Sequence, residues 1–70
     1  MTYKNPPKIA KKGTIVRARE DGVSFNGNLI TKGFLYVLQK DEVIGLYSIR
    51  DDHGQLDARH VEGFEIILEP

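Results

Sequence analysis

"FLYVLQKDEVIGLYSIRD", residues 34–51, is the stretch that decides the fold class. Its two halves, 34–41 and 44–51, are rich in aromatic and β-branched residues, and little more than Glu42 and Val43 separates them. This composition is typical of β-strands, and the short separation is typical of a hairpin. The sequence therefore predicts two strands at the centre of the chain.

Apolar side chains alternate along these two runs. Phe34, Tyr36 and Leu38 are predicted to share one face of their strand, because successive strand side chains point to opposite faces. Tyr47 falls in a similar pattern in the second run. Tyr36 and Tyr47 are therefore predicted to be core or half-core residues rather than parts of a binding surface.

Three weaker runs flank this centre. We predict strands at 13–21 ("GTIVRARED"), 55–60 ("QLDARH") and 64–69 ("FEIILE"), with a tight turn at 61–63 and a long irregular loop at 22–33. No segment shows the sustained 3.6-residue period of a helix. Strands that are apolar on both faces are typical of a small, strongly bent barrel or sandwich. The prediction is an all-β domain of five short strands.

The 70 residues are enough for one domain. Residues 1–12 contain Pro6, Pro7 and four lysines, which is typical of an extended arm, so we place the barrel domain at 13–70. The chain has no cysteine, which fits a reducing cytoplasm. No apolar run is long enough to span a bilayer and the opening residues lack a signal-peptide core, so we expect a soluble, cytoplasmic protein without a membrane partner.

Four motifs carry a family resemblance. They are "KKGTIVRARED" (11–21), "LITKGFLYVLQKDE" (29–42), "GLYSIRDDHGQ" (45–55) and "VEGFEII" (61–67). Together they resemble small SH3-like barrel proteins of bacteriophages and their hosts, most of them of unknown function. The resemblance implies a five-stranded SH3-like barrel and a small phage or phage-derived protein in the host cytoplasm. The opening "KKGTIVR" is also similar to the first strand of KOW-type barrels, which bind RNA and proteins.

The acidic stretch after the central run could be a site or a turn. Asp51 and Asp52 precede His53 and Gly54, which are all favoured turn residues, and Gly54 can supply a positive φ. A metal site built from Asp52, His53 and His60 is the alternative, and it would raise the melting temperature when zinc or manganese is added. We predict a turn, with no metal and no cofactor.

Catalysis is not expected from this sequence. There is no cysteine nucleophile, no histidine at an informative spacing from a serine or threonine, and no glycine loop of the phosphate-binding type. The chain is therefore predicted to be a non-enzymatic interaction module.

Charge is distributed unevenly along the chain. Residues 1–19 hold six basic residues and no acid, whereas residues 20–70 hold ten acids and four basic residues. Positions 17 and 19 point to one face of the first strand, so the basic end could bind phosphates. The candidate nucleic-acid residues are Lys4, Lys8, Lys11, Lys12, Arg17 and Arg19. The alternative is that the two arginines pair with acids on the neighbouring strand.

The long loop offers a different contact. Phe25 lies between Ser24, Asn26 and Gly27, so it is the large apolar side chain that we expect to be exposed. We predict that Phe25, Asn26 and Asn28 contact a host protein, and that binding of nucleic acid by the basic arm is the alternative function. A monomer is expected, although self-association through an open barrel edge stays possible.

Overall fold

The computed structural model describes residues 9–24 and 27–70. Seven strands and one short 3-10 helix lie in these residues: β1 (Ile15–Ala18), β2 (Gly22–Ser24), β3 (Gly27–Ile30), β4 (Leu35–Val37), β5 (Leu46–Arg50), β6 (Leu56–His60), η1 (Val61–Gly63) and β7 (Phe64–Leu68). The all-β prediction is confirmed. In the described part of the chain, no helix has the length and apolar character needed to cross a membrane.

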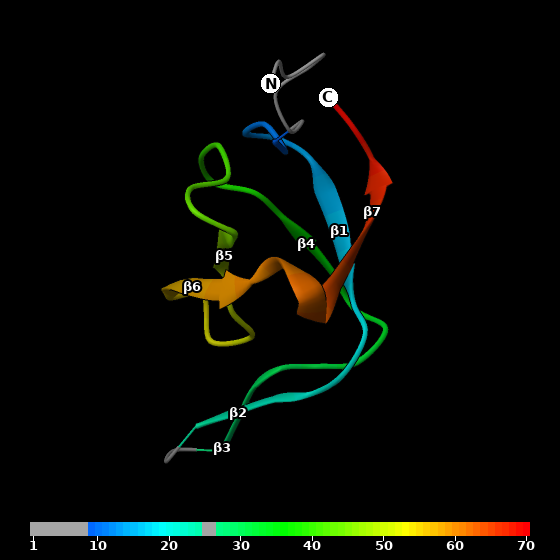
Figure 1. The fold of residues 1–70 in the computed structure, drawn as a ribbon. Helices are drawn as coiled ribbons and strands as arrows, with labels where there is room; N and C mark the ends of the chain where they lie inside the picture. Colours follow the sequence, from blue (N-terminus) through cyan, green and yellow to red (C-terminus); the bar gives the residue numbers. More distant parts are fainter. Residues whose placement is uncertain (1–8, 25–26) are drawn as a thin grey trace, which may run out of the picture.

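The largest sheet in the described residues is antiparallel and three-stranded, in the order β4-β1-β7 (Figure 1). Val16 pairs with Tyr36 on one side and with Ile66 on the other, and its side chain is completely buried. Arg17, the next residue, pairs with Leu35 and Glu65. Because neighbouring strand residues alternate between faces, Arg17 and its two partners lie on the outer face of this sheet.

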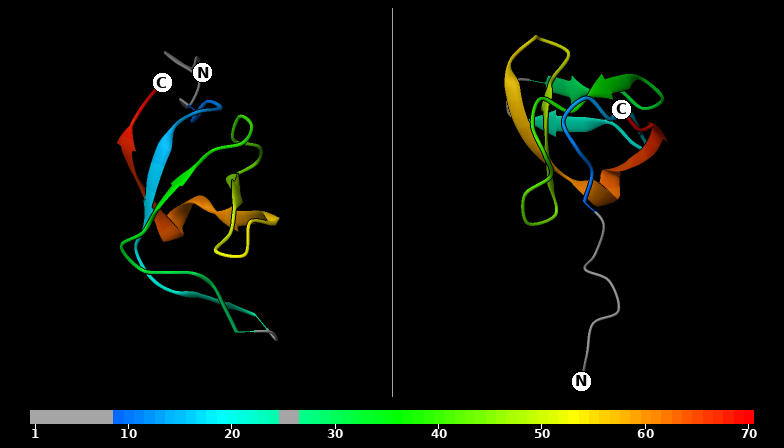
Figure 2. Two further views of the ribbon diagram at one scale, coloured as in Figure 1. Left: turned by 180° about the vertical axis from the view of Figure 1, so that it is seen from behind. Right: turned by 90° about the horizontal axis from the view of Figure 1, so that it is seen from above.

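A second sheet pairs β5 with β6 in an antiparallel hairpin (Figure 2). The halves of the stretch 34–51 therefore belong to different ladders, since β4 pairs with β1, and the prediction that they form one hairpin with each other is wrong. Between them, the Gln39 N–H donates a 2.7 Å hydrogen bond to the Ser48 carbonyl. Leu38 still bonds to Gly13 and Thr14 beside β1, and the chain then reaches β5 through a tight turn closed between Val43 and Leu46.

The long loop predicted at 22–33 is largely a β-hairpin, so that prediction is also wrong. β2 and β3 pair antiparallel and extend away from the rest of the chain (Figure 1). The register shifts between Gly22 and Val23, which marks a bulge. The glycines that argued against regular structure are compatible with a bulged hairpin, because a bulge and a tight turn both favour glycine.

The core lies between these sheets. Its buried hydrophobic residues are Ala10, Val16, Ala18, Ile30, Tyr36, Leu38, Tyr47, Ile49 and Phe64. The rings of Tyr36 and Tyr47 meet the Phe64 ring edge to face, with centroids 6.1 and 6.0 Å away. The core placement of both tyrosines is confirmed. Phe34 is 57% exposed, contrary to its predicted place beside Tyr36, because it lies in a turn closed by its N–H bond to the Thr31 carbonyl.

Residues 9–12 pack against the loop around residue 42. The Ala10 N–H donates to Glu42 Oε1 at 3.1 Å, and the Glu42 N–H donates to the Ala10 carbonyl at 2.8 Å. The Lys12 N–H donates to Asp41 Oδ1 at 2.8 Å. This part of the predicted arm therefore contacts the body of the domain, and residues 1–8 lie outside the described residues.

The described strands form three small sheets rather than one closed barrel. Their orders are β4-β1-β7, β2-β3 and β5-β6. The architecture is thus all-β, with two hairpins around a three-stranded sheet.

Candidate functional site

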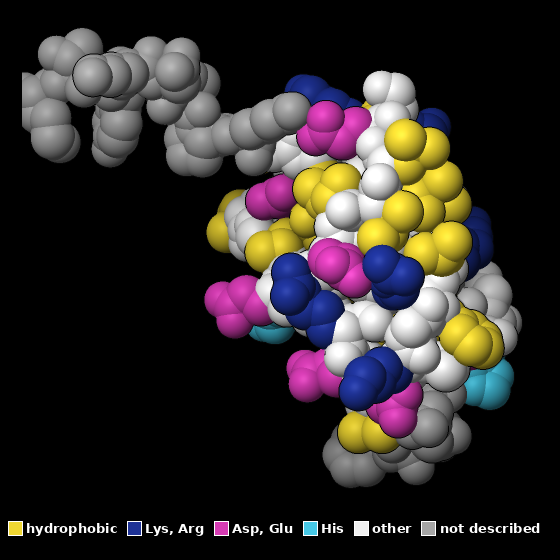
Figure 3. Space-filling model, turned by 90° about the vertical axis from the view of Figure 1, so that its right-hand side faces the viewer, with side chains coloured by type: hydrophobic (Ala, Val, Ile, Leu, Met, Phe, Trp, Pro, Cys, Tyr) yellow, Lys and Arg dark blue, Asp and Glu magenta, His cyan; other side chains and the backbone are white. Residues whose placement is uncertain are grey.

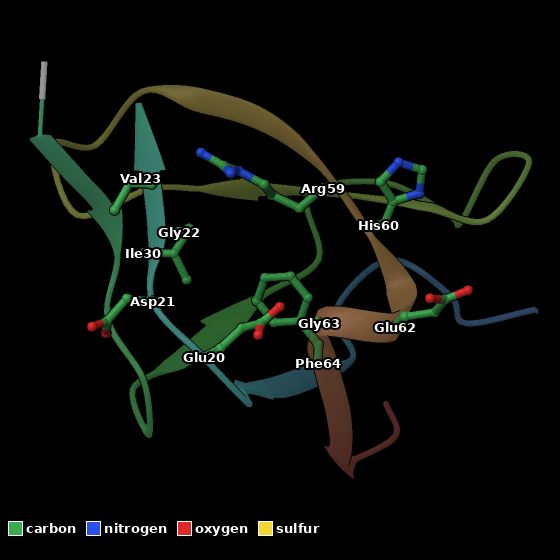
Figure 4. Close-up of a pocket in the computed structure, with 10 residues that line it drawn as sticks. All are labelled: Glu20, Asp21, Gly22, Val23, Ile30, Arg59, His60, Glu62, Gly63 and Phe64. Carbon is green, nitrogen blue, oxygen red and sulfur yellow. The ribbon is translucent and has the colours of Figure 1, made fainter. Parts of the chain in front are cut away.

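A hollow of about 600 Å³ separates the β2–β3 hairpin from the segment that runs from β6 through η1 into β7 (Figure 4). We call it the groove. It is lined by Glu20, Asp21, Gly22, Val23, Ile30, Arg59, His60, Glu62, Gly63 and Phe64. Residues distant in the sequence thus form its two walls, and its volume lies within the range of about 300–1,000 Å³ that is usual for ligand pockets.

Carboxylates predominate in this lining. Glu20 and Asp21 come from the segment that enters β2, and Glu62 comes from η1. In Figure 4 the Glu20 side chain points toward Phe64, whereas the Glu62 side chain points away from it. The lining also contains Arg59, but its Nε lies 2.8 Å from Asp57 Oδ2, so a carboxylate outside the groove already neutralises it. The groove therefore has an excess of negative charge.

The floor of the groove is apolar and closely packed. Phe64 and Ile30 are 6% and 2% exposed. Gly22 lies so close to Ile30 that an added Cβ would come within 2.9 Å of the Ile30 Cβ, and within 3.2 Å of the Arg59 Nη1. Figure 4 shows the Arg59 side chain extending toward β2. Glycine at position 22 therefore lets β2 lie against the buried Ile30 of β3 and leaves room for the Arg59 side chain from the other wall.

A hydrogen-bond network fixes the base of the β2–β3 hairpin. The hydroxyls of Tyr36 and Thr31 donate to the two carboxylate oxygens of Asp52, each at 2.6 Å. The Thr31 N–H donates to the Tyr36 hydroxyl at 2.8 Å, and the Asp52 N–H donates to the Leu29 carbonyl at 2.7 Å. Burial first, and then the bond to Asp52, raise the pKa of Tyr36. Asp52 therefore connects the hairpin to a distant turn, a role that the sequence did not reveal.

The turn predicted at residues 51–54 is confirmed. Asp51 Oδ1 accepts hydrogen bonds from the N–H groups of His53 and Gln55 at 2.8 and 3.0 Å, and Gly54 has a φ of 80°. These bonds explain why the segment combines aspartate, histidine and glycine. Among the described residues, no group of three or more acidic, histidine or cysteine side chains is arranged to hold a metal ion.

The side chains of three of the six predicted basic residues contact partners within the described part of the domain. Arg17 Nε lies 3.0 Å from Glu65 Oε1 on the neighbouring strand. Arg19 Nε donates to the Phe64 carbonyl at 3.1 Å, and Lys11 Nζ lies 3.9 Å from Asp41 Oδ2. Lys12 is exposed, whereas Lys4 and Lys8 lie outside the described residues. The phosphate-binding role of this set stays a prediction.

The predicted protein-contact residues belong to the β2–β3 hairpin. Phe25 and Asn26 lie outside the described residues, and Asn28 pairs with Val23 in the ladder. Their contact with a partner therefore stays a prediction. Val23 is 67% exposed and belongs to the groove lining, so the hairpin does contribute to the site.

A second surface is the outer face of the β4-β1-β7 sheet. Hydrophobic side chains gather on the side of the molecule shown in Figure 3. Leu35, Val37 and Leu68 are 57%, 45% and 61% exposed, and the register places them beside Arg17 or Ile15. This face has no described hollow, and the ion pair between Arg17 and Glu65 balances its charge. This face is therefore an apolar surface without the charged hollow that the groove has.

Sequence reasoning missed the groove because its walls come from separated segments. The available signal was the acidic excess after residue 19, which does not reveal which acids come together. Comparison of the chain with protein-family models, with curated proteins and with solved structures gave no match. A functional proposal for this chain therefore rests on the geometry of the site.

Proposed function

We propose that this domain is a non-enzymatic binding module whose groove holds an extended, basic segment of a partner protein. The observation that carries the proposal is a groove whose lining combines the exposed apolar side chain of Val23 with the carboxylates of Glu20, Asp21 and Glu62. A segment with lysine or arginine would place its alkyl stem against Val23 and its charged end beside a carboxylate of the lining.

Charge supports a basic ligand. Two opposite unit charges 4 Å apart attract by about 1 kcal/mol in water and by about 4 kcal/mol at the effective dielectric constant near a protein surface. Carboxylates on both walls would also increase the rate of encounter with a cationic segment, more strongly at low salt. Nucleic acid is negatively charged, as the groove is, so the groove would repel it.

Proline-rich ligands fit the groove less well. Domains that bind them use exposed aromatic side chains. Here Tyr36, Tyr47 and Phe64 are all at least 94% buried, so they supply little aromatic surface. Charge, rather than aromatic stacking, is therefore the basis of the recognition that we propose.

The finer fold and the setting belong to the same proposal. The order of elements, with a hairpin after β1 and a 3-10 turn before the last strand, supports an SH3-like barrel. The phage origin, the host protein as partner and the host cytoplasm follow from the resemblance in the sequence. The contact of Phe25 with that partner is part of the proposal as well.

Selection from a library of displayed random 12-residue peptides tests the function directly. The immobilised protein is compared with a double variant, Glu20→Gln with Glu62→Gln, and with a matched control, Glu65→Gln, which neutralises a carboxylate on the outer sheet face. We expect the wild type and the control to enrich peptides with lysine or arginine. The double variant is expected to bind the same peptides at least tenfold more weakly.

Two results would overturn the proposal. One is a wild type that enriches nothing above the empty support, and the other is enrichment that the double variant retains. A single-stranded DNA 20-mer is the parallel probe: binding that weakens steeply with salt would favour the basic residues at positions 11–19 instead.

A further inference from the structure

Ile44 has an unusual backbone conformation. Its φ is 50°, and it is the one described residue other than glycine with a positive φ. It forms a two-residue turn with Gly45, closed by reciprocal backbone hydrogen bonds of 3.1 and 3.0 Å between Val43 and Leu46. Such turns favour asparagine, aspartate or glycine at this position, because β-branched side chains fit poorly at positive φ.

Packing does not explain the isoleucine either. The Ile44 side chain is 94% exposed, so burial within the domain contributes almost nothing at this position. Val43, beside it, is 51% exposed. Ile44 thus exposes an apolar, β-branched side chain to solvent at a backbone conformation that such side chains disfavour. Strain of this kind is concentrated at functional sites.

The turn adjoins the groove. The Gly45 carbonyl accepts a 3.0 Å hydrogen bond from the Val61 N–H, at the first residue of η1. Leu46 pairs with His60, which lines the groove. The turn that carries Ile44 therefore lies beside η1, at the edge of the wall that β6 and η1 form.

We propose that Ile44 is a specificity-determining residue, which packs against a large apolar side chain of the partner segment bound in the groove. The inference rests on the proposed function, and it defines the ligand further: an extended protein segment with a basic residue for the groove and a large apolar residue beside it. Exposed apolar side chains on a rigid turn are suitable anchors for such contacts.

The displayed random 12-residue peptides test the inference through the pattern that each variant selects. The test variant is Ile44→Asn, which keeps the turn and removes the apolar side chain. The matched control is Leu56→Asn, which removes an exposed leucine of β6 that does not line the groove. We expect the wild type and the control to enrich peptides that combine a basic and a large apolar residue. Ile44→Asn is expected to keep the basic residue and to lose the apolar preference.

Binding of one enriched peptide gives the quantitative test. We expect Ile44→Asn to weaken it at least fivefold, and to melt at or above the temperature of the wild type, which shows that the loss is not unfolding. An unchanged apolar preference in Ile44→Asn overturns the inference and leaves the proposed function standing. Loss of the preference for a basic residue in Ile44→Asn also overturns the inference. A wild type that enriches no peptide overturns both the inference and the proposed function.

Discussion

The hydroxyl of Tyr36 lies 2.6 Å from Oδ1 of Asp52 and donates a hydrogen bond to it. The other oxygen of this carboxylate accepts from Thr31, which directly follows the β2–β3 hairpin. One exposed aspartate in a turn therefore connects the core to the base of the hairpin that forms one wall of the groove. This relationship gives the first testable consequence.

Replacing Asp52 by asparagine should destabilise the protein modestly. The asparagine side chain has one acceptor oxygen, where aspartate has two, and no charge. Either the Tyr36 or the Thr31 hydroxyl therefore loses its acceptor. We expect the free energy of unfolding to fall by about 1 kcal/mol, the usual net contribution of a hydrogen bond. Urea unfolding measures the change.

Tyr36→Phe provides the partner variant for a double-mutant cycle with Asp52→Asn. If the two groups interact as the 2.6 Å distance indicates, the double variant loses less stability than the two single losses combined. Fully additive losses would show that this hydrogen bond contributes nothing to stability.

Alkaline pH should reveal the raised pKa of Tyr36. Its ordinary value is 10.0, and burial holds the folded value above it. The neutral phenol of Tyr36 therefore contributes its full stabilisation below about pH 10. As the pH rises through the pKa of Tyr36 in the folded protein, this stabilisation is lost, by up to about 1.4 kcal/mol per pH unit for one group. Unfolding by urea between pH 8 and pH 11.5 should show this decline. Burial also raises the pKa of Tyr47, so Tyr36→Phe should reduce the decline without abolishing it.

Gly22→Ala tests the close contact between β2 and the buried Ile30 side chain of β3. The new Cβ would lie 2.9 Å from two atoms of the buried Ile30 side chain, so the hairpin or the core must shift. Overpacking of this kind costs about 1–3 kcal/mol. Gly63→Ala is the matched control, because a Cβ there meets nothing within 4 Å. Equal melting temperatures for the two variants would contradict the packing described for Gly22.

The strain at Ile44 predicts a stabilising substitution. Ile44→Gly removes the side chain that disfavours a φ of 50°, and burial is not lost because the side chain is 94% exposed. The left-handed conformation costs about 1–2 kcal/mol for an ordinary residue, and the greater freedom of glycine in the unfolded chain offsets part of this gain. A rise in the free energy of unfolding is expected, and a clear fall would show that the turn is not strained.

The fold class could be predicted from the sequence, and the strand pairing could not. Alternation around Tyr36 and Tyr47 indicates strands and core correctly, because it depends on local side-chain direction. The pairing depends on which edges meet in space. The short separation of the two central runs therefore predicts one hairpin, whereas β4 pairs with β1 and β5 pairs with β6. Glycines at 22 and 27 were interpreted as loop signals, yet a bulged hairpin also uses glycine.

The site was harder to predict than the fold. Asp51 was interpreted correctly as a turn residue, since its bonds are local. The bonds of Asp52 reach residues 16 and 21 positions away, which no local pattern reveals. Glu20 and Glu62 likewise come to line the same groove only through the tertiary fold. Ile44 did carry a local signal, because an isoleucine before glycine in a short turn is unusual.

Mapping of a bound peptide by amide NMR tests the central claim most directly. The isotope-labelled protein is titrated with the most enriched basic peptide, at 150 mM salt, and the shifted amides are placed on the structure. The account predicts that the largest shifts fall on residues 20–23, 30 and 59–64, with a second group at 43–45. Shifts confined to the outer face of the β4-β1-β7 sheet, or absent altogether, would contradict the claim that the acidic groove is the binding site.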